Sequence, residues 1–288
     1  MMRKLQQSRI GFTLVELLIS LAIGATVLAG VLTGYMVCRK LVNRQRLQNE
    51  IRANVRTLMM YLVKDLSMTG YGLPVSDAEL SSWTTLLGVT GMTNNPQIIQ
   101  GSAGYPDRIR IAAAFRSAST LAADAAAGST TIVLSSNNTD AAWQNQLWQN
   151  DNKLIYVGGC ELARLTGDPM GGTTLTISTH PSNVSGLTYN HQAGEPVEMI
   201  QVYDYSYYGN LTDGFYISRG INDSTDGYWW YTAIAYSIFD IVFSRSDQMM
   251  TVTITGRSEE ADLIAAGGSY SNGYQWLTMM DNVIMRNL

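Results

Sequence analysis

One acidic residue interrupts a long apolar stretch near the start of the sequence. From Phe12 to Cys38 every residue is apolar, small or hydroxylated except Glu16, and the stretch exceeds the roughly 20 residues that a helix needs to cross a bilayer. A carboxylate at the centre of a spanning helix costs roughly 2.5–3.5 kcal/mol, and less near the interface, so it usually marks a functional position. Two interpretations are open for Glu16: pairing with a cation, or extension towards the lipid headgroups without a partner.

Residues that commonly carry out catalysis or bind metals are scarce in the rest of the chain. His180 and His191 fall in predicted loops without a nearby cysteine or suitably spaced carboxylates, so we expect surface or turn histidines and no metal site. The chain contains no G-x-S-x-G motif, which marks the nucleophile of many serine hydrolases. The sequence therefore predicts a protein that is not an enzyme and that uses no cofactor.

Residues 222–227 (NDSTDG) are similar to the beginning of a calcium-binding loop. An EF-hand loop needs a glutamate at its last position, and that position is Ala233 in this chain. Calcium binding stays open as an alternative, but the expectation is a turn rich in Asn and Asp.

The two cysteines, Cys38 and Cys160, exclude a disulfide-dense scaffold and a four-cysteine zinc site. A bridge between them would need Cα atoms within about 7 Å. Cys38 belongs to the apolar N-terminal stretch and Cys160 to the middle of the chain, so we expect both to be unpaired.

Four consecutive bulky aromatic residues, Tyr228, Trp229, Trp230 and Tyr231, form the most unusual cluster of the C-terminal third. A strand sends alternate side chains to opposite faces, so four such residues in a row are difficult to bury together. Tyrosine and tryptophan concentrate at binding surfaces. The cluster is therefore a candidate partner surface, and the alternative is ordinary packing on a sheet.

Basic residues flank the apolar stretch on both sides. Residues 1–11 contain three bases and no acid, and a second basic group follows the stretch: Arg39, Lys40, Arg44 and Arg46. Cytoplasmic flanks of spanning helices carry an excess of Lys and Arg. Because both flanks are basic, this rule gives no orientation by itself.

The sequence SRIGFTLVELLISLAIG resembles the prepilin signal of type IV pilins and type II secretion pseudopilins, with a short basic leader before Gly11 and Phe12 and a glutamate at Glu16. The resemblance implies that prepilin peptidase cleaves after Gly11 on the cytoplasmic side and that Phe12 is N-methylated. It also implies that Glu16 pairs with the terminal amine of a neighbouring subunit during assembly. The protein would cross the inner membrane once with its head in the periplasm, and later reach the pilus or cell surface.

A helical pattern continues beyond the apolar stretch. Large aliphatic residues recur with a period of three or four, typical of one buried helix face: Leu47, Ile51, Val55, Leu58, Leu62 and Leu66. The pattern predicts one helix from residue 12 to about residue 67, with 12–38 in the membrane or filament core and 39–67 packed on a sheet with its arginines outward. Gly70, Gly72 and Pro74 are expected to end it.

The remaining sequence has short alternating segments that predict an antiparallel β head. We expect strands near 107–115, 130–136, 153–159, 160–166, 173–179 and 195–208, then a hairpin within 202–220 and strands at 232–245 and 249–257. Residues 68–115 and 195–288 would form the pilin head, and 116–194 an inserted β-rich module, either a sandwich or a small barrel. The predicted class is α+β, with the type IV pilin fold.

The composition supports a folded protein with an acidic head. Hydrophobic residues make up 46% of the chain and charged residues 15%, against about 25% charged in typical soluble domains, which argues against intrinsic disorder. Residues 68–288 contain nine bases and twenty acids, a net charge of −11. A head of this charge is not expected to bind nucleic acid.

Three further segments are similar to PilW-type minor pilins, which are related to the J-type minor pseudopilin of type II secretion. They are the helix end ANVRTLMMYLVKDLSMTGYG, a tyrosine-rich hairpin that ends in Ile217-Ser218-Arg219, and the terminal MRNL. The resemblance implies a minor pilin that primes a type IV pilus or lies at its tip, with other minor and major pilins as partners. The alternatives are a minor pseudopilin of a type II secretion system and a membrane-anchored periplasmic binding or adhesion protein that does not polymerise.

Overall fold

The computed structural model describes most of the chain after residue 12. The described residues are 13–73, 80, 82–83, 89, 92–102, 104–135, 154–166, 173–178, 186–210, 214–222, 229–258, 274 and 276–285. The chain divides into two compact units, Met1–Asn49 and Glu50–Leu288.

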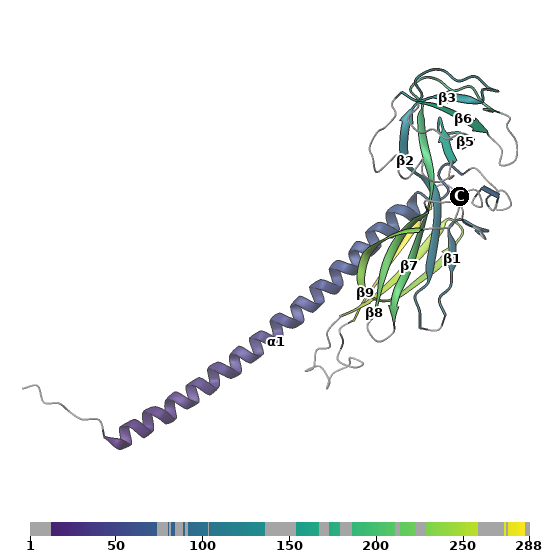
Figure 1. The fold of residues 1–288 in the computed structure, drawn as a ribbon. Helices are drawn as coiled ribbons and strands as arrows, with labels where there is room; N and C mark the ends of the chain where they lie inside the picture. Colours follow the sequence, from purple (N-terminus) through teal and green to yellow (C-terminus); the bar gives the residue numbers. More distant parts are fainter. Residues whose placement is uncertain are drawn as a thin grey trace, which may run out of the picture. The chain divides into compact units, whose positions relative to one another are not determined.

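A single helix, α1 (Leu14–Ser67), connects the two units in sequence (Figure 1). The part in the first unit is apolar and has exposed side chains, for example Leu21 at 67% and Val31 at 65% exposure. By length and composition α1 is able to cross a membrane. The prediction of one helix from about residue 12 to residue 67 is confirmed.

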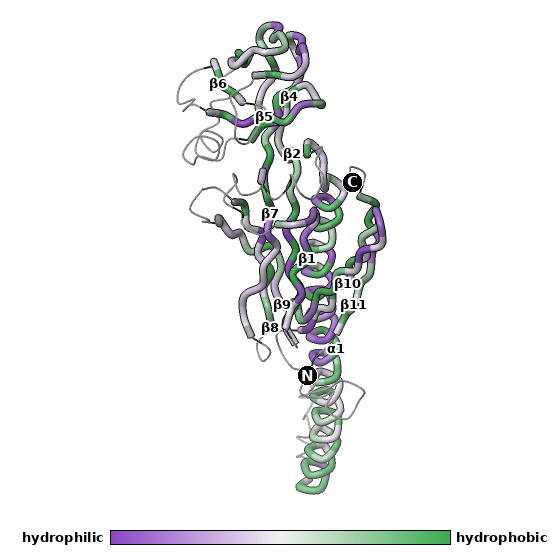
Figure 2. The backbone as a smooth tube through the Cα atoms, turned by 90° about the vertical axis from the view of Figure 1, so that its right-hand side faces the viewer, coloured by the Kyte–Doolittle hydropathy of each residue, from purple (hydrophilic) through white to green (hydrophobic). Residues whose placement is uncertain are grey.

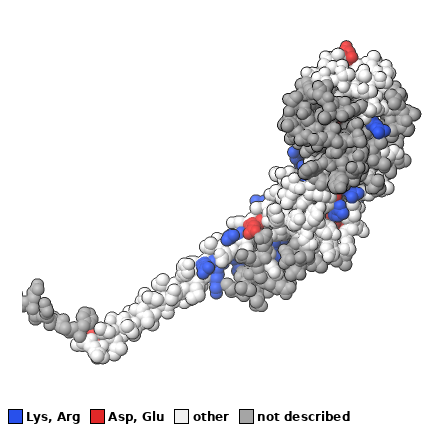
Figure 3. Space-filling model, viewed as in Figure 1, with Lys and Arg blue, Asp and Glu red and all other residues white. Residues whose placement is uncertain are grey.

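The end of α1 packs against the sheet of the second unit. Ile51, Val55, Leu58, Leu62 and Leu66 are each 2% exposed or less, and they form one core with apolar residues of the long strands. Arg52 and Arg56 lie on the exposed side, and Figure 3 shows Lys and Arg side chains near the middle of the long helix. The predicted stripe and the outward arginines are therefore confirmed.

The helix ends where two glycines adopt a left-handed conformation. Gly70 and Gly72 both have φ of 79°, which costs a residue with a Cβ about 1–2 kcal/mol. A Cβ on Gly72 would also lie 2.8 Å from the Cβ of Ala114. Both glycines end the helix as predicted, and Pro74 lies outside the described residues.

The described strands form an antiparallel sheet of eleven strands. Its larger part consists of β1 (Gln97–Ile99), β2 (Arg108–Thr120), β7 (Pro196–Asn210), β8 (Gly214–Asn222), β9 (Trp229–Ser246), β10 (Met249–Arg257) and β11 (Trp276–Ile284). From β7 to β11 the order follows the sequence, and β2 and then β1 lie on the other side of β7 (Figures 1 and 2). We call this part the main sheet.

Four shorter strands form what we call the β3–β6 module: β3 (Thr131–Val133), β4 (Leu154–Val157), β5 (Glu161–Leu165) and β6 (Thr174–Ser178). β4 pairs with β7, and the order continues through β5 and β6 to β3. An isolated bridge between Leu121 and Leu134 then returns to the end of β2. The strands thus enclose a second apolar core, which is separate from the core under α1.

The extent of one strand differs from the expected one, and two strands were not predicted. β2 passes residue 115 without a break and ends at Thr120, although its pairing with β7 shifts register between Ala114 and Arg116 and again between Ser117 and Ser119. Such bulges bend a strand and increase its twist. β1 and β11 are the strands that were not predicted.

Candidate functional site

Thr13 and Glu16 form a capping box at the start of α1. The Thr13 backbone N–H donates to Glu16 Oε2 across 3.0 Å, and the Thr13 hydroxyl donates to the same oxygen across 2.9 Å. The Glu16 N–H is 3.3 Å from Thr13 Oγ1. In this T-x-x-E arrangement two orphan backbone donors are satisfied reciprocally. Within a single chain Glu16 therefore has a local partner, while Gly11 and Phe12 lie outside the described residues.

The capping box lies at the N-terminal end of an exposed apolar surface of α1. Leu14, Val15, Leu17 and Leu18 are each more than half exposed in the single chain, and Glu16 is the only acid in the first turn. Such a surface is stable in water only when lipid or other apolar helices cover it. This part of the chain is therefore suited to a bilayer or to packing against other apolar helices.

Residues 7–32 match the family model described as the prokaryotic N-terminal methylation motif. The match supports a type IV pilin-like prepilin. The matched range contains Gly11, Phe12, Thr13 and Glu16, and the motif implies processing by prepilin peptidase and assembly with other pilins. Together with the apolar N-terminal helix it is consistent with anchoring in the inner membrane. No curated protein and no solved structure matches the chain at a significant level.

A buried ionic network joins the end of α1 to the main sheet. Asp65, which is 1% exposed, accepts a hydrogen bond from Arg219 Nε at 2.7 Å and one from the Tyr205 hydroxyl at 2.5 Å. The Arg219 guanidinium also lies 3.6 Å from the centre of the Tyr203 ring. Burial and the Asp65 carboxylate raise the pKa of Tyr205 well above its usual value. The end of α1 and the β7–β8 hairpin thus meet at this network.

A second acid, Asp204, accepts hydrogen bonds from several polar side chains of the main sheet. Its carboxylate is fully buried and accepts from Arg108 at 2.7 Å, from the Ser206 hydroxyl at 2.9 Å and from the Tyr231 hydroxyl at 3.0 Å. Burial, and then Asp204, raise the pKa of Tyr231 to about 12. The network ties β2, β7 and β9 together.

Three exposed tyrosines and the half-buried Tyr231 form a ladder across three strands next to Asp204. Tyr208 and Tyr216 stack with ring centres 5.3 Å apart, Tyr231 meets Tyr208 edge-on, and Tyr236 follows Tyr216 at 6.0 Å. The stacked pair turns its ring faces towards each other, so cross-strand packing occupies those faces.

The predicted aromatic partner surface coincides with the start of β9. Tyr231 is half-buried there, with its hydroxyl on Asp204 and its ring over Gly220. Trp229 and Trp230 belong to β9 by backbone. Tyr228 and the candidate calcium turn after Asn222 lie outside the described residues. The structure therefore gives Tyr231 a role inside the sheet, and partner contact through the other three residues stays a prediction.

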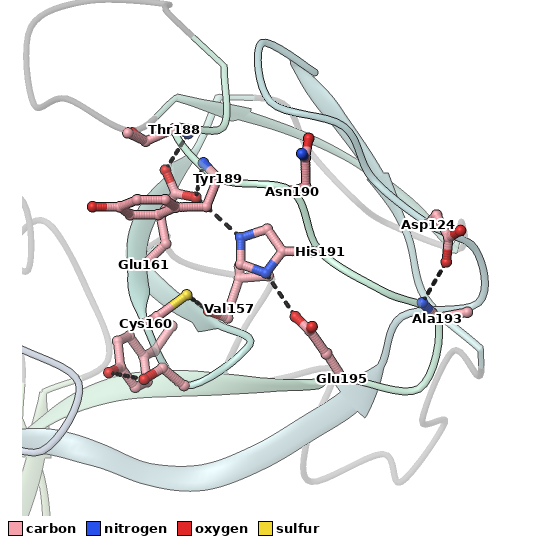
Figure 4. Close-up of polar contacts among 12 residues, drawn as sticks. Asp124, Val157, Cys160, Glu161, Thr188, Tyr189, Asn190, His191, Ala193 and Glu195 are labelled. Carbon is pink, nitrogen blue, oxygen red and sulfur yellow. Dashed lines mark hydrogen bonds and ion pairs between the residues drawn. The ribbon is translucent and has the colours of Figure 1, made fainter.

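His191 is buried between two glutamates in the β3–β6 module (Figure 4). Its Nε2 is 3.0 Å from Glu161 Oε2 and its Nδ1 is 2.7 Å from Glu195 Oε2. Ionised carboxylates only accept hydrogen bonds, so with both glutamates ionised this geometry fits an imidazolium that donates from both nitrogens. The hydrogen bond from His191, and then the Gln192 backbone, lower the pKa of Glu195.

This His191 junction holds three chain segments together. The His191 backbone exchanges two hydrogen bonds with Ala125, and the Glu161 carboxylate also accepts from the backbone N–H groups of Thr188 and Tyr189. Asp124 accepts from the Ala193 N–H at 2.8 Å. The expectation of a surface histidine was wrong for His191, because Glu161 lies thirty residues earlier in the chain and supplies a buried partner that local sequence does not reveal.

The remaining candidates give no further site among the described residues. No group of three or more His, Cys, Asp or Glu residues that could hold a metal gathers in that part of the chain. The glutamates of the His191 junction approach opposite nitrogens of the ring, so they do not share a centre with it. Cys38 and Cys160 are unpaired, as predicted, and both are exposed, and His180 lies outside the described residues.

Proposed function

We propose that the protein is a minor type IV pilin of PilW type, a structural subunit and not an enzyme. The observation that carries the proposal is the methylation motif at residues 7–32, directly on a helix whose exposed apolar half is followed by a half packed on an antiparallel sheet. Prepilin peptidase exposes Phe12, and the apolar part of α1 then joins a bundle of other pilin helices. The Asp65–Arg219 contact supports the PilW assignment, because it couples two of the segments on which that resemblance rests.

Within a filament we place this subunit at the tip, where it primes assembly. The second unit contains an eleven-stranded sheet with three apolar clusters among its described residues, and a head of this size is better accommodated at an end than in a closely stacked shaft. Immunogold labelling of pili in cells that carry an epitope-tagged chain tests the position. Label at one pilus end is expected, and regular label along the shaft would contradict the tip assignment.

Mass spectrometry of the intact protein extracted from membranes tests the prepilin step. Loss of residues 1–11 and one methyl group on Phe12 are expected. A chain that keeps its N-terminus while the peptidase is active would make it a plain membrane anchor, and the filament assignment would then be wrong.

Glu16→Gln tests the assembly role separately from processing. We expect normal cleavage and membrane insertion, but a loss of the subunit from sheared pili, because the amide cannot neutralise the terminal amine of a neighbour. Glu50→Gln, at the other glutamate of α1, is the matched control and should assemble normally. Equal behaviour of the two variants would favour a membrane-anchored protein that does not polymerise.

A minor pseudopilin of type II secretion is the alternative within the same class, since the methylation motif fits both machines. Deletion of the chain distinguishes them. Fewer pili with unchanged protein secretion supports the pilin, whereas unchanged piliation with a loss of secreted enzymes in the medium would identify the pseudopilin.

A further inference from the structure

β11 is a long strand at the edge of the main sheet (Figure 2). All nine of its residues pair with β10, from Trp276 opposite Arg257 to Ile284 opposite Met249. Among the described strands no other one pairs with β11. Its outer side therefore presents a row of backbone N–H and C=O groups that only another strand can pair completely.

β11 lacks most of the features that usually prevent strands from pairing at an edge, and Asp281 is its only charged residue. Natural edges are short, bulged, or interrupted by proline or lysine. β1, the edge strand on the far side, has three residues, whereas β11 has nine, contains neither proline nor lysine, and keeps an unbroken register with β10.

The face of β11 that turns away from α1 is exposed, and it carries two large apolar side chains, Met280 and Ile284, among polar ones. Met280 and Ile284 are 67% and 66% exposed, and their cross-strand neighbours are Thr253 and Met249. On the helix side of the strand, Val283 is buried in the core beneath α1. The strand is thus held on one face and open on the other and at its edge.

A single charge lies on this strand. Asp281 is exposed, and its only hydrogen bond in the described structure comes from the neighbouring Asn282 N–H at 2.8 Å. No ion pair reaches it among the described residues. An acid in an otherwise uncharged strand favours a partner that places a base opposite it.

We propose that β11 is a docking edge that accepts an extended strand of a different protein subunit, with apolar side chains over Met280 and Ile284 and a Lys or Arg opposite Asp281. Main-chain hydrogen bonds supply the affinity in this mode, and the alternate side chains supply the specificity. The inference goes beyond the proposed function, because it concerns the head and does not require a pilus.

A second copy of this chain fits the edge poorly. Its own β11 (WLTMMDNVI) offers one acid and no base, so a symmetric pair brings two carboxylates to one short interface and no countercharge. Like charges at that distance are unfavourable. The charge thus favours a different subunit over self-association.

Site-specific photocrosslinking in intact cells tests the docking edge in the full-length protein. p-Benzoylphenylalanine replaces Met280, Asn282 or Ile284 in turn, with Tyr236 of β9, which is 51% exposed, as the control position. Mass spectrometry then identifies the crosslinked residues. We expect one partner protein, captured from all three β11 positions and not from Tyr236, at partner residues that step by two along an extended segment.

Asp281→Lys tests the charge. We expect the crosslink yield at Met280 to fall about tenfold or more, because like charges at an interface cost several kcal/mol. Thr174→Lys, at an exposed position of β6, adds the same side chain to a different strand and should leave the yield unchanged. Asp281→Asn removes the charge but keeps the size of the side chain, and its crosslink yield at Met280 should lie between those of the unmodified protein and Asp281→Lys. This variant still tests the charge if Asp281→Lys folds poorly.

Three results would overturn the proposal. One is crosslinking at β11 no stronger than at Tyr236, and another is crosslinking only to β11 of a second copy. The third is a contact with helical spacing in the partner, since residues three or four apart would mean that a helix and not a strand covers the edge.

Discussion

Arg219 Nε lies 2.7 Å from Asp65 Oδ2, and this contact joins β8 to the last turn of α1. Asp65 is 1% exposed, and the Arg219 side chain is 21% exposed. A buried acid without its countercharge is strongly unfavourable. The contact therefore holds the end of the helix against the main sheet.

Asp65→Ala should destabilise the second unit by about 3 kcal/mol, because it leaves the Arg219 guanidinium and the Tyr205 hydroxyl without their acceptor in a mostly buried place. Urea denaturation of the detergent-solubilised protein, followed by tryptophan fluorescence, measures the change. The double variant Asp65→Leu with Arg219→Met is the control. Its free energy of unfolding should fall by less than that of Asp65→Ala, because no buried charge remains. A larger loss in the double variant would show that the ion pair itself is strongly stabilising.

Gly256→Ala should cost about 1–3 kcal/mol through overpacking. A Cβ at this position would lie 2.6 Å from Val55 Cγ2 and 2.8 Å from Ile51 Cγ2, both on the buried face of α1. Thermal unfolding followed by circular dichroism measures the loss. Val55→Ala should partly rescue Gly256→Ala, and strictly additive losses would mean that the cost of Gly256→Ala does not come from its contact with Val55.

Gly158→Ala and Gly159→Ala form a matched pair that tests the His191 junction. Both glycines have positive φ, 60° and 69°, so both variants carry similar backbone strain. A Cβ on Gly158 would collide with the Glu195 carboxylate and the His191 ring, whereas nothing lies within 4 Å of a Cβ on Gly159. We expect Gly158→Ala to be less stable than Gly159→Ala by about 1–3 kcal/mol, measured by thermal unfolding, and equal losses would contradict a structural role for the junction.

The junction also predicts a loss of stability in acid. The pKa of Glu195 is lower in the folded protein than its ordinary value of 4.5, so the carboxylate contributes stability that is fully present above about pH 4.5 and is lost as the pH falls through the lowered value. Glu195→Gln should melt below the unmodified protein at pH 6 and approach it below pH 4. Glu161, Asp124 and Cys160 are the other titratable groups around His191. A difference in melting temperature that stays constant from pH 6 to pH 3 would contradict the prediction.

The parts of the fold that follow a local period were predictable from the sequence. The stripe from Ile51 to Leu66 has the spacing of a helix face and is buried. β10 alternates apolar and polar residues, and its burial alternates in the same way. In β11 the alternation fails, because Met280 is apolar on the open face and Asp281 is polar on the helix side, and this strand was missed.

Polar contacts between residues close in the sequence were also predictable, whereas those between distant residues were not. The Thr13–Glu16 capping box was present in the sequence as T-x-x-E and could have been recognised there. The Asp65–Arg219 and Glu161–His191 contacts join residues 154 and 30 positions apart. No spacing rule in a single sequence connects residues at such separations, so only the fold shows these pairs.

β2 and β7 belong to both the main sheet and the β3–β6 module, and this continuity has a mechanical consequence. A force applied to the module is transmitted through the backbones of β2 and β7, which are paired from Ile109 opposite Tyr205 to Thr120 opposite Pro196. The hydrogen bonds between antiparallel strands lie across the strands, so tension along β7 is shared by many of them in shear and does not open them one at a time. A load applied to the module along β7 would therefore meet the sheet in the direction in which many of these hydrogen bonds resist it together.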